Sequence, residues 1–140
     1  MIAYVESSVV LRLVLGQPGA LSEWRSLDGG VASALVEVEC LRTLDRLRLA
    51  EGLRESELAR RRETVYRMLE TLEVVEPTRP ILTRAAQPLP VVLGTLDAIH
   101  LATALAWREV TETDLAFATH DARLATAARA LGLHAIGVAA

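Results

Sequence analysis

Short apolar runs alternate along the chain with longer stretches in which apolar residues recur every three or four positions. A short apolar run bounded by turn signals predicts a buried strand, whereas the longer spacing predicts a helix with one buried face. Four to five strands are predicted in this way, at residues 2–5, 31–33, 73–76, 115–119 and 133–138. Segments of helical pattern separate them, which is typical of an α/β fold with a central parallel sheet.

The helical segments begin and end at recognisable signals. Helices are predicted at residues 9–15, 20–27, 34–49, 56–72, 79–86, 95–107 and 122–131. Ser7, Ser8 and Thr95 are the expected N-caps, and Gly52 and Gly132 follow two of the helices. The expected apolar face of the 34–49 helix consists of Leu35, Val38, Leu41, Leu44 and Leu49. No repeat or linker interrupts residues 1–140, so we expect one domain with helices on both faces of the sheet.

The composition is that of a globular domain. Of the 140 residues, 51% are hydrophobic and 24% are charged, which excludes a disordered chain. The single cysteine, Cys40, excludes a disulfide framework and a cysteine-based zinc or iron–sulfur site. The first six residues contain no basic leader, and no apolar run is long enough to span a bilayer. We therefore expect a cytoplasmic protein without a membrane partner.

The charge narrows the possible functions further. The net charge is −3, which argues against general coating of duplex DNA. All 15 basic residues are arginine, and the chain contains no lysine. This excludes a Walker-A phosphate loop, Schiff-base catalysis and attachment of pyridoxal phosphate, because each of them needs a lysine.

Acidic residues follow the predicted strands or lie early in the helices that come after them. Glu6 ends the first strand, Asp121 follows the fourth, and Glu37, Glu39 and Asp97 lie early in their helices. Parallel strands place such residues at one edge of the sheet. Each acid taken alone can simply cap a helix. Several converging carboxylates, however, repel one another unless a cation lies among them, and Mg²⁺ or Mn²⁺ prefers such oxygen ligands.

Four segments resemble, in the same order, the motifs of the PIN-domain family and, within it, the VapC-type toxins of bacterial toxin–antitoxin pairs. Residues 93–104 (LGTLDAIHLATA) look very like the family's Leu-Asp-Ala-x-His-Leu-Ala segment. Residues 117–128 (FATHDARLATAA) are similar to its final Thr-x-Asp and Ala-Ala helix. Residues 4–11 (YVESSVVL) are similar to its first strand with Asp-x-Ser, and residues 33–42 (SALVEVECLR) to its Ser, Glu, Arg pattern.

The resemblance implies a Mg²⁺-dependent endoribonuclease toxin, with Mn²⁺ as a possible substitute ion. On the matching positions, the metal would be held by Glu6, Glu39, Asp97 and Asp121. The family motif selects Glu39 over Glu37, a choice that the pattern of acids left open. Ser8 and Thr119 would be polar groups that orient carboxylates or waters.

The resemblance also implies partners. It implies a homodimer, an RNA substrate and a small cognate antitoxin, whose chain lies over an apolar groove and delivers a basic residue to the acids. We expect the groove on the helices of residues 34–49 and 56–72, which are rich in Leu, Val and Met. Arg42 lies three positions after Glu39, so it is placed either to pair with Glu39 or to contact an RNA phosphate.

One position departs from the family pattern, because Glu6 stands where the family has an aspartate. The extra methylene lengthens the side chain by about 1.5 Å. The alternative function is therefore a catalytically weakened domain that acts mainly by binding RNA or an antitoxin. A phosphohydrolase of the haloacid-dehalogenase type would need a second Asp at the position of Ser8 and also a lysine, and the sequence has neither.

Several remaining residues are interpreted as structural. His100 and His120 are each expected to pack and to bond a neighbour, rather than to serve as a base or ligand. Cys40 is expected to be a small buried residue, and the arginines at positions 60–62 are expected to lie on a solvated helix face.

Overall fold

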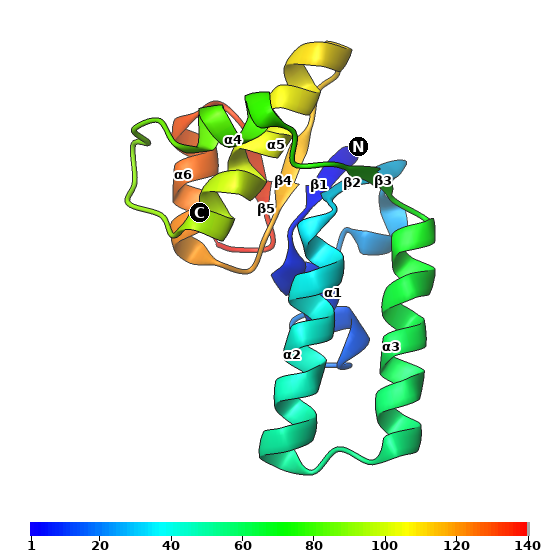
Figure 1. The fold of residues 1–140 in the computed structure, drawn as a ribbon. Coiled ribbons are helices and arrows are strands. Elements are labelled where there is room, and N and C mark those ends of the chain that lie inside the picture. Colours follow the sequence, from blue (N-terminus) through cyan, green and yellow to red (C-terminus); the bar gives the residue numbers. More distant parts are fainter. Residues whose placement is uncertain (140) are drawn as a thin grey trace.

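A five-stranded parallel sheet forms the centre of the computed structural model, which describes residues 1–139 (Figure 1). The strands are β1 (Ile2–Val5), β2 (Gly29–Ser33), β3 (Glu73–Val75), β4 (Ala116–Ala118) and β5 (His134–Ile136). Their order in the sheet is β3-β2-β1-β4-β5, and every neighbouring pair is parallel. The carboxyl ends of all the strands therefore lie at one edge, as expected from the sequence.

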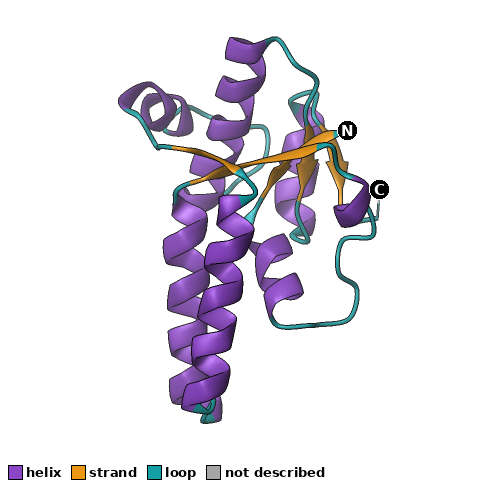
Figure 2. Ribbon diagram, turned by 90° about the vertical axis from the view of Figure 1, so that its right-hand side faces the viewer, coloured by secondary structure: helices purple, strands orange, loops and turns teal. Residues whose placement is uncertain are grey.

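Within residues 1–139, six α-helices connect the strands. They are α1 (Ser7–Val14), α2 (Leu35–Glu51), α3 (Glu55–Glu70), α4 (Arg79–Ala85), α5 (Thr95–Thr111) and α6 (Ala122–Ala130). The helices α2 and α3 lie side by side as a hairpin that extends well beyond the sheet (Figures 1 and 2). Gly52 ends α2 in the left-handed conformation, with φ of 64°, where a residue without a side chain is favoured.

The two faces of the sheet carry separate hydrophobic clusters. In β1, the side chains of Ala3 and Val5 join the cluster formed with α1, α2 and α3, whereas Tyr4 joins the cluster formed with α5 and α6. This division follows from the alternation of side chains along a strand. The predicted α/β class, with helices on both faces of a parallel sheet, is thus confirmed.

The predicted helix at residues 20–27 is wrong. Only a single 3-10 turn, Trp24–Ser26, forms there. The chain must become extended directly afterwards, because the Asp28 N–H donates to the carbonyl of Met1 over 2.9 Å and begins the pairing of β2 with β1. Strand β2 consequently starts at Gly29. The predicted start was two positions later, because the glycines at positions 29 and 30 indicated a turn. At Gly30 the packing is close, and a Cβ atom would require the Leu72 side chain to shift.

The expected apolar face of the 34–49 helix is partly wrong. The buried side chains of α2 are Val36, Cys40 and Leu44, which are spaced four residues apart. Val38 is 52% exposed because it lies on another side of the helix, and Leu49, near the end of α2, is 70% exposed. Cys40 is buried, as predicted.

Two expected caps also differ. Helix α1 begins at Ser7 and its N-cap is Glu6, so Ser7 and Ser8 lie inside the helix. Helix α5 begins at Thr95 itself, after Gly94 in the N-cap position. Among the helices of residues 1–139, none has the length and apolar character needed to cross a membrane.

Candidate active site

Four acidic residues from distant parts of the sequence lie near the ends of β1 and β4. Glu6 directly follows β1, and its backbone N–H donates to the carbonyl of Ala118 at the end of β4 over 3.1 Å. Asp121 lies three residues beyond β4, as the N-cap of α6. Glu39 lies early in α2, and Asp97 lies in the first turn of α5.

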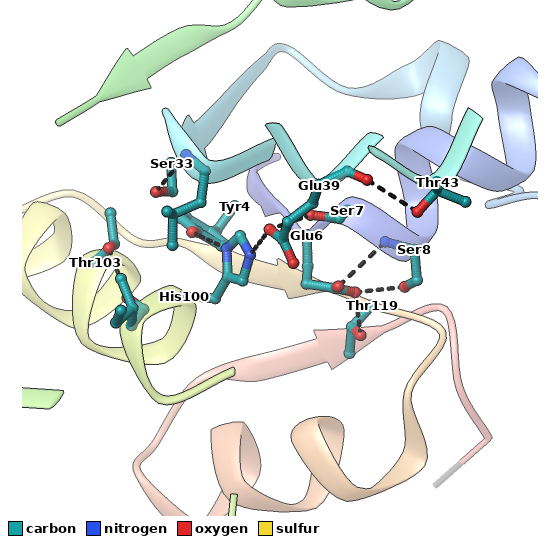
Figure 3. A network of polar contacts seen from close by, with 12 residues as sticks. Tyr4, Glu6, Ser7, Ser8, Ser33, Glu39, Thr43, His100, Thr103 and Thr119 are labelled. Atoms are coloured by element: carbon teal, nitrogen blue, oxygen red, sulfur yellow. Dashed lines mark hydrogen bonds and ion pairs between the residues drawn. The ribbon is translucent and has the colours of Figure 1, made fainter. Parts of the chain in front are cut away.

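The carboxylate of Glu6 is almost fully buried and is held by two neighbouring residues (Figure 3). Its Oε1 accepts a hydrogen bond of 3.1 Å from the Ser8 backbone N–H, and its Oε2 accepts one from the Ser8 hydroxyl. The Thr119 hydroxyl donates to the same Oε2 over 2.8 Å. Glu6 therefore stabilises the start of α1, and its carboxylate has a defined direction at the strand ends.

Ser8 and Thr119 also connect Glu6 to the segment after β4. The Ser8 hydroxyl accepts a hydrogen bond of 2.9 Å from the His120 backbone N–H. The Thr119 hydroxyl accepts one of 3.0 Å from the backbone N–H of Asp121. The structure thus brings together the two hydroxyl residues that the sequence singled out and two of the acids.

Glu39 is the second acid with a defined orientation. Its Oε1 accepts a hydrogen bond of 2.7 Å from the Ser7 hydroxyl and lies 2.5 Å from Nε2 of His100. Burial by itself would raise the pKa of Glu39, but the hydrogen bond and positive potential of His100, together with Ser7, bring the pKa below its ordinary value. Glu37 is exposed on another side of α2.

Behind Glu39 lie two buried residues, Tyr4 and His100. The Tyr4 hydroxyl is 2.6 Å from Nδ1 of His100, and neither residue is exposed to solvent. Burial, followed by the charges of Glu6 and Glu39, raises the pKa of Tyr4 well above its ordinary value, so Tyr4 keeps its proton. His100 thus packs and bonds neighbours, as predicted, but one of those neighbours is a site acid.

The sequence interpretation missed Tyr4 and Ser7. The sequence did contain a signal that Tyr4 takes part in a polar network. A tyrosine within an otherwise apolar buried strand needs a hydrogen-bond partner for its hydroxyl. No pattern indicated which partner that would be.

Asp97 and Asp121 complete the group of acids. Burial, then the negative charges of Asp121 and Glu6, raises the pKa of Asp97; His100 opposes this and Glu39 adds to it. Asp121 is exposed, and its Oδ1 accepts a hydrogen bond of 3.0 Å from the Leu124 N–H. The four acids therefore lie close enough together for each of the others to affect Asp97.

The donor set suits a hard divalent cation. In residues 1–139, no arginine forms an ion pair with any of the four acids, so their negative charge is largely uncompensated. Carboxylate and hydroxyl oxygens are the ligands that Mg²⁺ prefers. As the side chains stand, no three His, Cys, Asp or Glu residues within this range are grouped closely enough to hold an ion. The four acids therefore suit a divalent cation by their charge and by the chemistry of their oxygen ligands.

A groove runs past these acids between α1, α2 and the start of α5. Its walls include Glu6, Glu39, Val38, Arg42, Arg46 and Leu96. Arg42 is exposed and pairs with Asp45 over 3.5 Å, so the expected alternative in which it pairs with Glu39 is wrong. The His120 imidazole bonds the carbonyl of Gly137 over 2.9 Å, which agrees with the structural interpretation of this residue.

Comparison with known sequences identifies similar proteins over nearly the whole chain. The family model of the PIN domain matches residues 3–130. The chain is 34% identical over 137 residues to Ribonuclease VapC46 of Mycobacterium tuberculosis (strain ATCC 25618 / H37Rv), covering 95% of each protein. It is 30% identical over 132 residues to Ribonuclease VapC47 of Mycobacterium tuberculosis (strain CDC 1551 / Oshkosh), covering 92% of this chain and 91% of that protein.

Two solved structures share the fold, each with a TM-score of 0.66. One is a toxin–antitoxin complex from Klebsiella pneumoniae, 17% identical, with coverage of 99% of this chain and 96% of that chain. The other is VapBC2 from Rickettsia felis bound to a DNA fragment from their promoter, 12% identical, with coverage of 96% and 97%. At these identities the likeness is one of fold.

Proposed function

Because the chain belongs to the PIN-domain family and is of the VapC type, we propose that it is a Mg²⁺-dependent endoribonuclease toxin that hydrolyses RNA phosphodiesters. One structural observation carries the proposal. Glu6, Glu39, Asp97 and Asp121 gather at one edge of the sheet with no arginine paired to them in residues 1–139. The relatives named as ribonucleases support RNA as the substrate class.

The four carboxylates would hold the Mg²⁺, or an Mn²⁺ in its place. When bound, such an ion lowers the pKa of a coordinated water and offsets negative charge on the phosphodiester. The side chains of this protein orient the ligands beforehand. Ser8 and Thr119 hold the Glu6 carboxylate, and the N–H of Leu124 holds that of Asp121.

The groove beside the acids suits a phosphate backbone. Arg42 and Arg46 lie one and two helical turns after Glu39 and line the same groove. We place the phosphates that flank the scissile bond against these two arginines, since guanidinium groups favour phosphate oxygens. Val38 and Leu96, which are 52% and 47% exposed, offer apolar surface at the rim.

An antitoxin is the proposed regulatory partner. Both similar solved structures come from toxin–antitoxin systems, which supports this proposal. A second groove, between α1, α2 and α3, has Leu15, Leu47 and Leu53 in its lining, together with polar and charged side chains. It adjoins the acid-bearing groove, since Ser8, Leu11 and Thr43 line both. An antitoxin chain lying there would reach the acids directly.

We also propose that the protein is a homodimer. Sedimentation velocity over micromolar concentrations tests this, and a species with the mass of one chain throughout would contradict it.

A specific observation keeps the binding-only function as the second candidate. Glu6 is longer than the family's aspartate, and its carboxylate already accepts three hydrogen bonds. In that case the protein would bind RNA or the antitoxin with little cleavage.

Incubation of the purified protein with labelled RNA in Mg²⁺, in Mn²⁺ or in EDTA separates the two functions. The proposed ribonuclease cleaves in the divalent ions and stops in EDTA, and Asp97→Asn removes the cleavage while circular dichroism shows a retained fold. RNA binding without cleavage in either ion would support the second candidate.

A further inference from the structure

A series of hydrogen bonds runs from the interior of the sheet to the surface of the acid-bearing groove (Figure 3). The Tyr4 hydroxyl lies 2.6 Å from Nδ1 of His100, and Nε2 of His100 lies 2.5 Å from Oε1 of Glu39. Tyr4 is on β1 and His100 is on α5, and both are completely buried. Buried polar groups of this size require hydrogen-bond partners, and here each finds one in the other.

The chemistry of the three groups sets the direction of these bonds. A carboxylate only accepts, so His100 donates its Nε2 proton to Glu39. In a neutral imidazole the other nitrogen, Nδ1, is then an acceptor, and the Tyr4 hydroxyl donates to it. The tyrosine hydroxyl thereby favours the tautomer of His100 that points a donor at Glu39.

The two oxygens of Glu39 are treated differently. Oε1 receives the bonds of both His100 and Ser7, whereas Oε2 receives no hydrogen bond from any of the described residues 1–139. Glu39 also lines the acid-bearing groove. The carboxylate is therefore held through one oxygen, which leaves the other available in the groove.

We propose that Tyr4 and His100 are positioning residues that orient Glu39, so that its Oε2 is presented to a divalent cation in the groove. This inference rests on the proposed function, because the cation is the group to which Oε2 would be presented. Rigid orientation of a ligand before binding avoids the entropy that a freely rotating glutamate would lose.

The test measures cation affinity without RNA, by titrating Mn²⁺ calorimetrically into the folded protein. Tyr4→Phe keeps the ring that stacks on Phe117 at 5.2 Å and removes only the hydroxyl. We expect this variant to bind Mn²⁺ about tenfold more weakly, at the lower end of the range for residues that support metal ligands. His100→Leu removes both bonds and is expected to weaken binding further. His100→Gln carries one acceptor and one donor, and is expected to recover part of the affinity.

A buried variant outside this series provides the matched control. Val65→Ala creates a small cavity beneath α3, where Val65 is fully buried, and lowers the melting temperature without touching Glu39. It is expected to keep the natural Mn²⁺ affinity and the natural kcat. Tyr4→Phe is expected to lower kcat with little change in the KM for RNA, since the RNA contacts lie elsewhere in the groove.

The outcomes separate this inference from the function on which it rests. If Asp97→Asn loses Mn²⁺ binding while Tyr4→Phe binds as tightly as the natural protein, the metal site stands and the positioning role is overturned. If the natural protein does not bind Mn²⁺, the metal site fails and the positioning role fails with it. Weaker binding in Tyr4→Phe, with Val65→Ala unchanged, supports the inference even where His100→Leu does not fold.

Discussion

The Thr119 hydroxyl donates a hydrogen bond of 2.8 Å to Oε2 of Glu6, across 113 positions of the sequence. The same oxygen of Thr119 accepts the backbone N–H of Asp121 over 3.0 Å. One hydroxyl on the segment after β4 therefore orients an acid after β1 and the residue that caps α6. The relative placement of two proposed metal ligands depends on a side chain that is not itself charged.

Replacement of Thr119 by valine removes both of these bonds while keeping the shape of the side chain. We expect Thr119→Val to lose about 1–3 kcal/mol of unfolding free energy, because the Asp121 N–H is left unpaired and Oε2 of Glu6 keeps only its bond from the Ser8 hydroxyl. Cleavage of RNA is expected to fall about tenfold or more, as is typical when the groups that support metal ligands are removed. Thr119→Ser keeps the hydroxyl and should stay near the natural rate. Equal rates for the two variants in single-turnover assays would contradict the role given to this hydroxyl.

Replacement of Glu6 by aspartate tests the departure from the family pattern. Aspartate is a favoured N-cap residue, so the start of α1 should be retained. We expect Glu6→Asp to raise Mg²⁺-dependent cleavage about tenfold, equivalent to roughly 1.4 kcal/mol of barrier, and Glu6→Gln to lower it. The measurement is single-turnover cleavage by the three proteins at equal Mg²⁺. If Glu6→Gln cleaves as fast as the natural protein, Glu6 only caps the helix.

Asp97 predicts a pH dependence of stability in the absence of metal. Its pKa is raised by burial and by the neighbouring acids, so the folded state binds this proton more tightly than the unfolded state does. Stability is therefore lost as the pH rises from the ordinary range of Asp, about 3.9, through the raised value. In EDTA at pH 7, Asp97→Asn should melt at a higher temperature than the natural protein, and the difference should shrink below pH 4. A lower melting temperature for Asp97→Asn at pH 7 would contradict the crowding of charges.

The same variant tests the response to metal. Mg²⁺ or Mn²⁺ is expected to raise the melting temperature of the natural protein, since a ligand that binds only the folded state stabilises it. Asp97→Asn is expected to lose that rise. The melting temperature is measured by calorimetry or fluorescence. An equal rise in both proteins would show that the ion binds elsewhere.

Arg46 tests the proposed path of the RNA. It lines the acid-bearing groove, and within residues 1–139 its guanidinium donates only to Thr43 on its own helix, over 3.1 Å. We expect Arg46→Ala to raise the KM for RNA severalfold with little change in kcat, and to reduce the salt dependence of binding, because one phosphate contact is lost. Arg67→Ala is the control, since Arg67 lies on α3, away from this groove, and pairs with Glu63 on its own helix. A similar loss in both variants would show a general effect of charge.

Much of the fold was determined by local patterns in the sequence. The five strands and the helices α1 to α6 were all predicted, with shifts of a few residues at their ends, because apolar spacing and glycines such as Gly52 act over a few residues. The PIN-family resemblance, read from four short segments, was confirmed by the family match. The prediction of a helix at residues 20–27 failed. The hydrogen bond from the Asp28 N–H to the Met1 carbonyl, beside the pairing of β1 with β2, prevailed over local helix propensity.

For the site, the sequence by itself determined which acids stand near strand ends, and with the family motif it favoured Glu39 over Glu37. Only the tertiary structure decided what holds each acid. The partners of Glu39 come from α1 and α5, and one partner of Glu6 comes from the segment after β4. Residues such as Tyr4 and Glu39 are brought together by packing of β1, α2 and α5, and hydrogen bonds between such distant positions leave no periodic signal in the sequence.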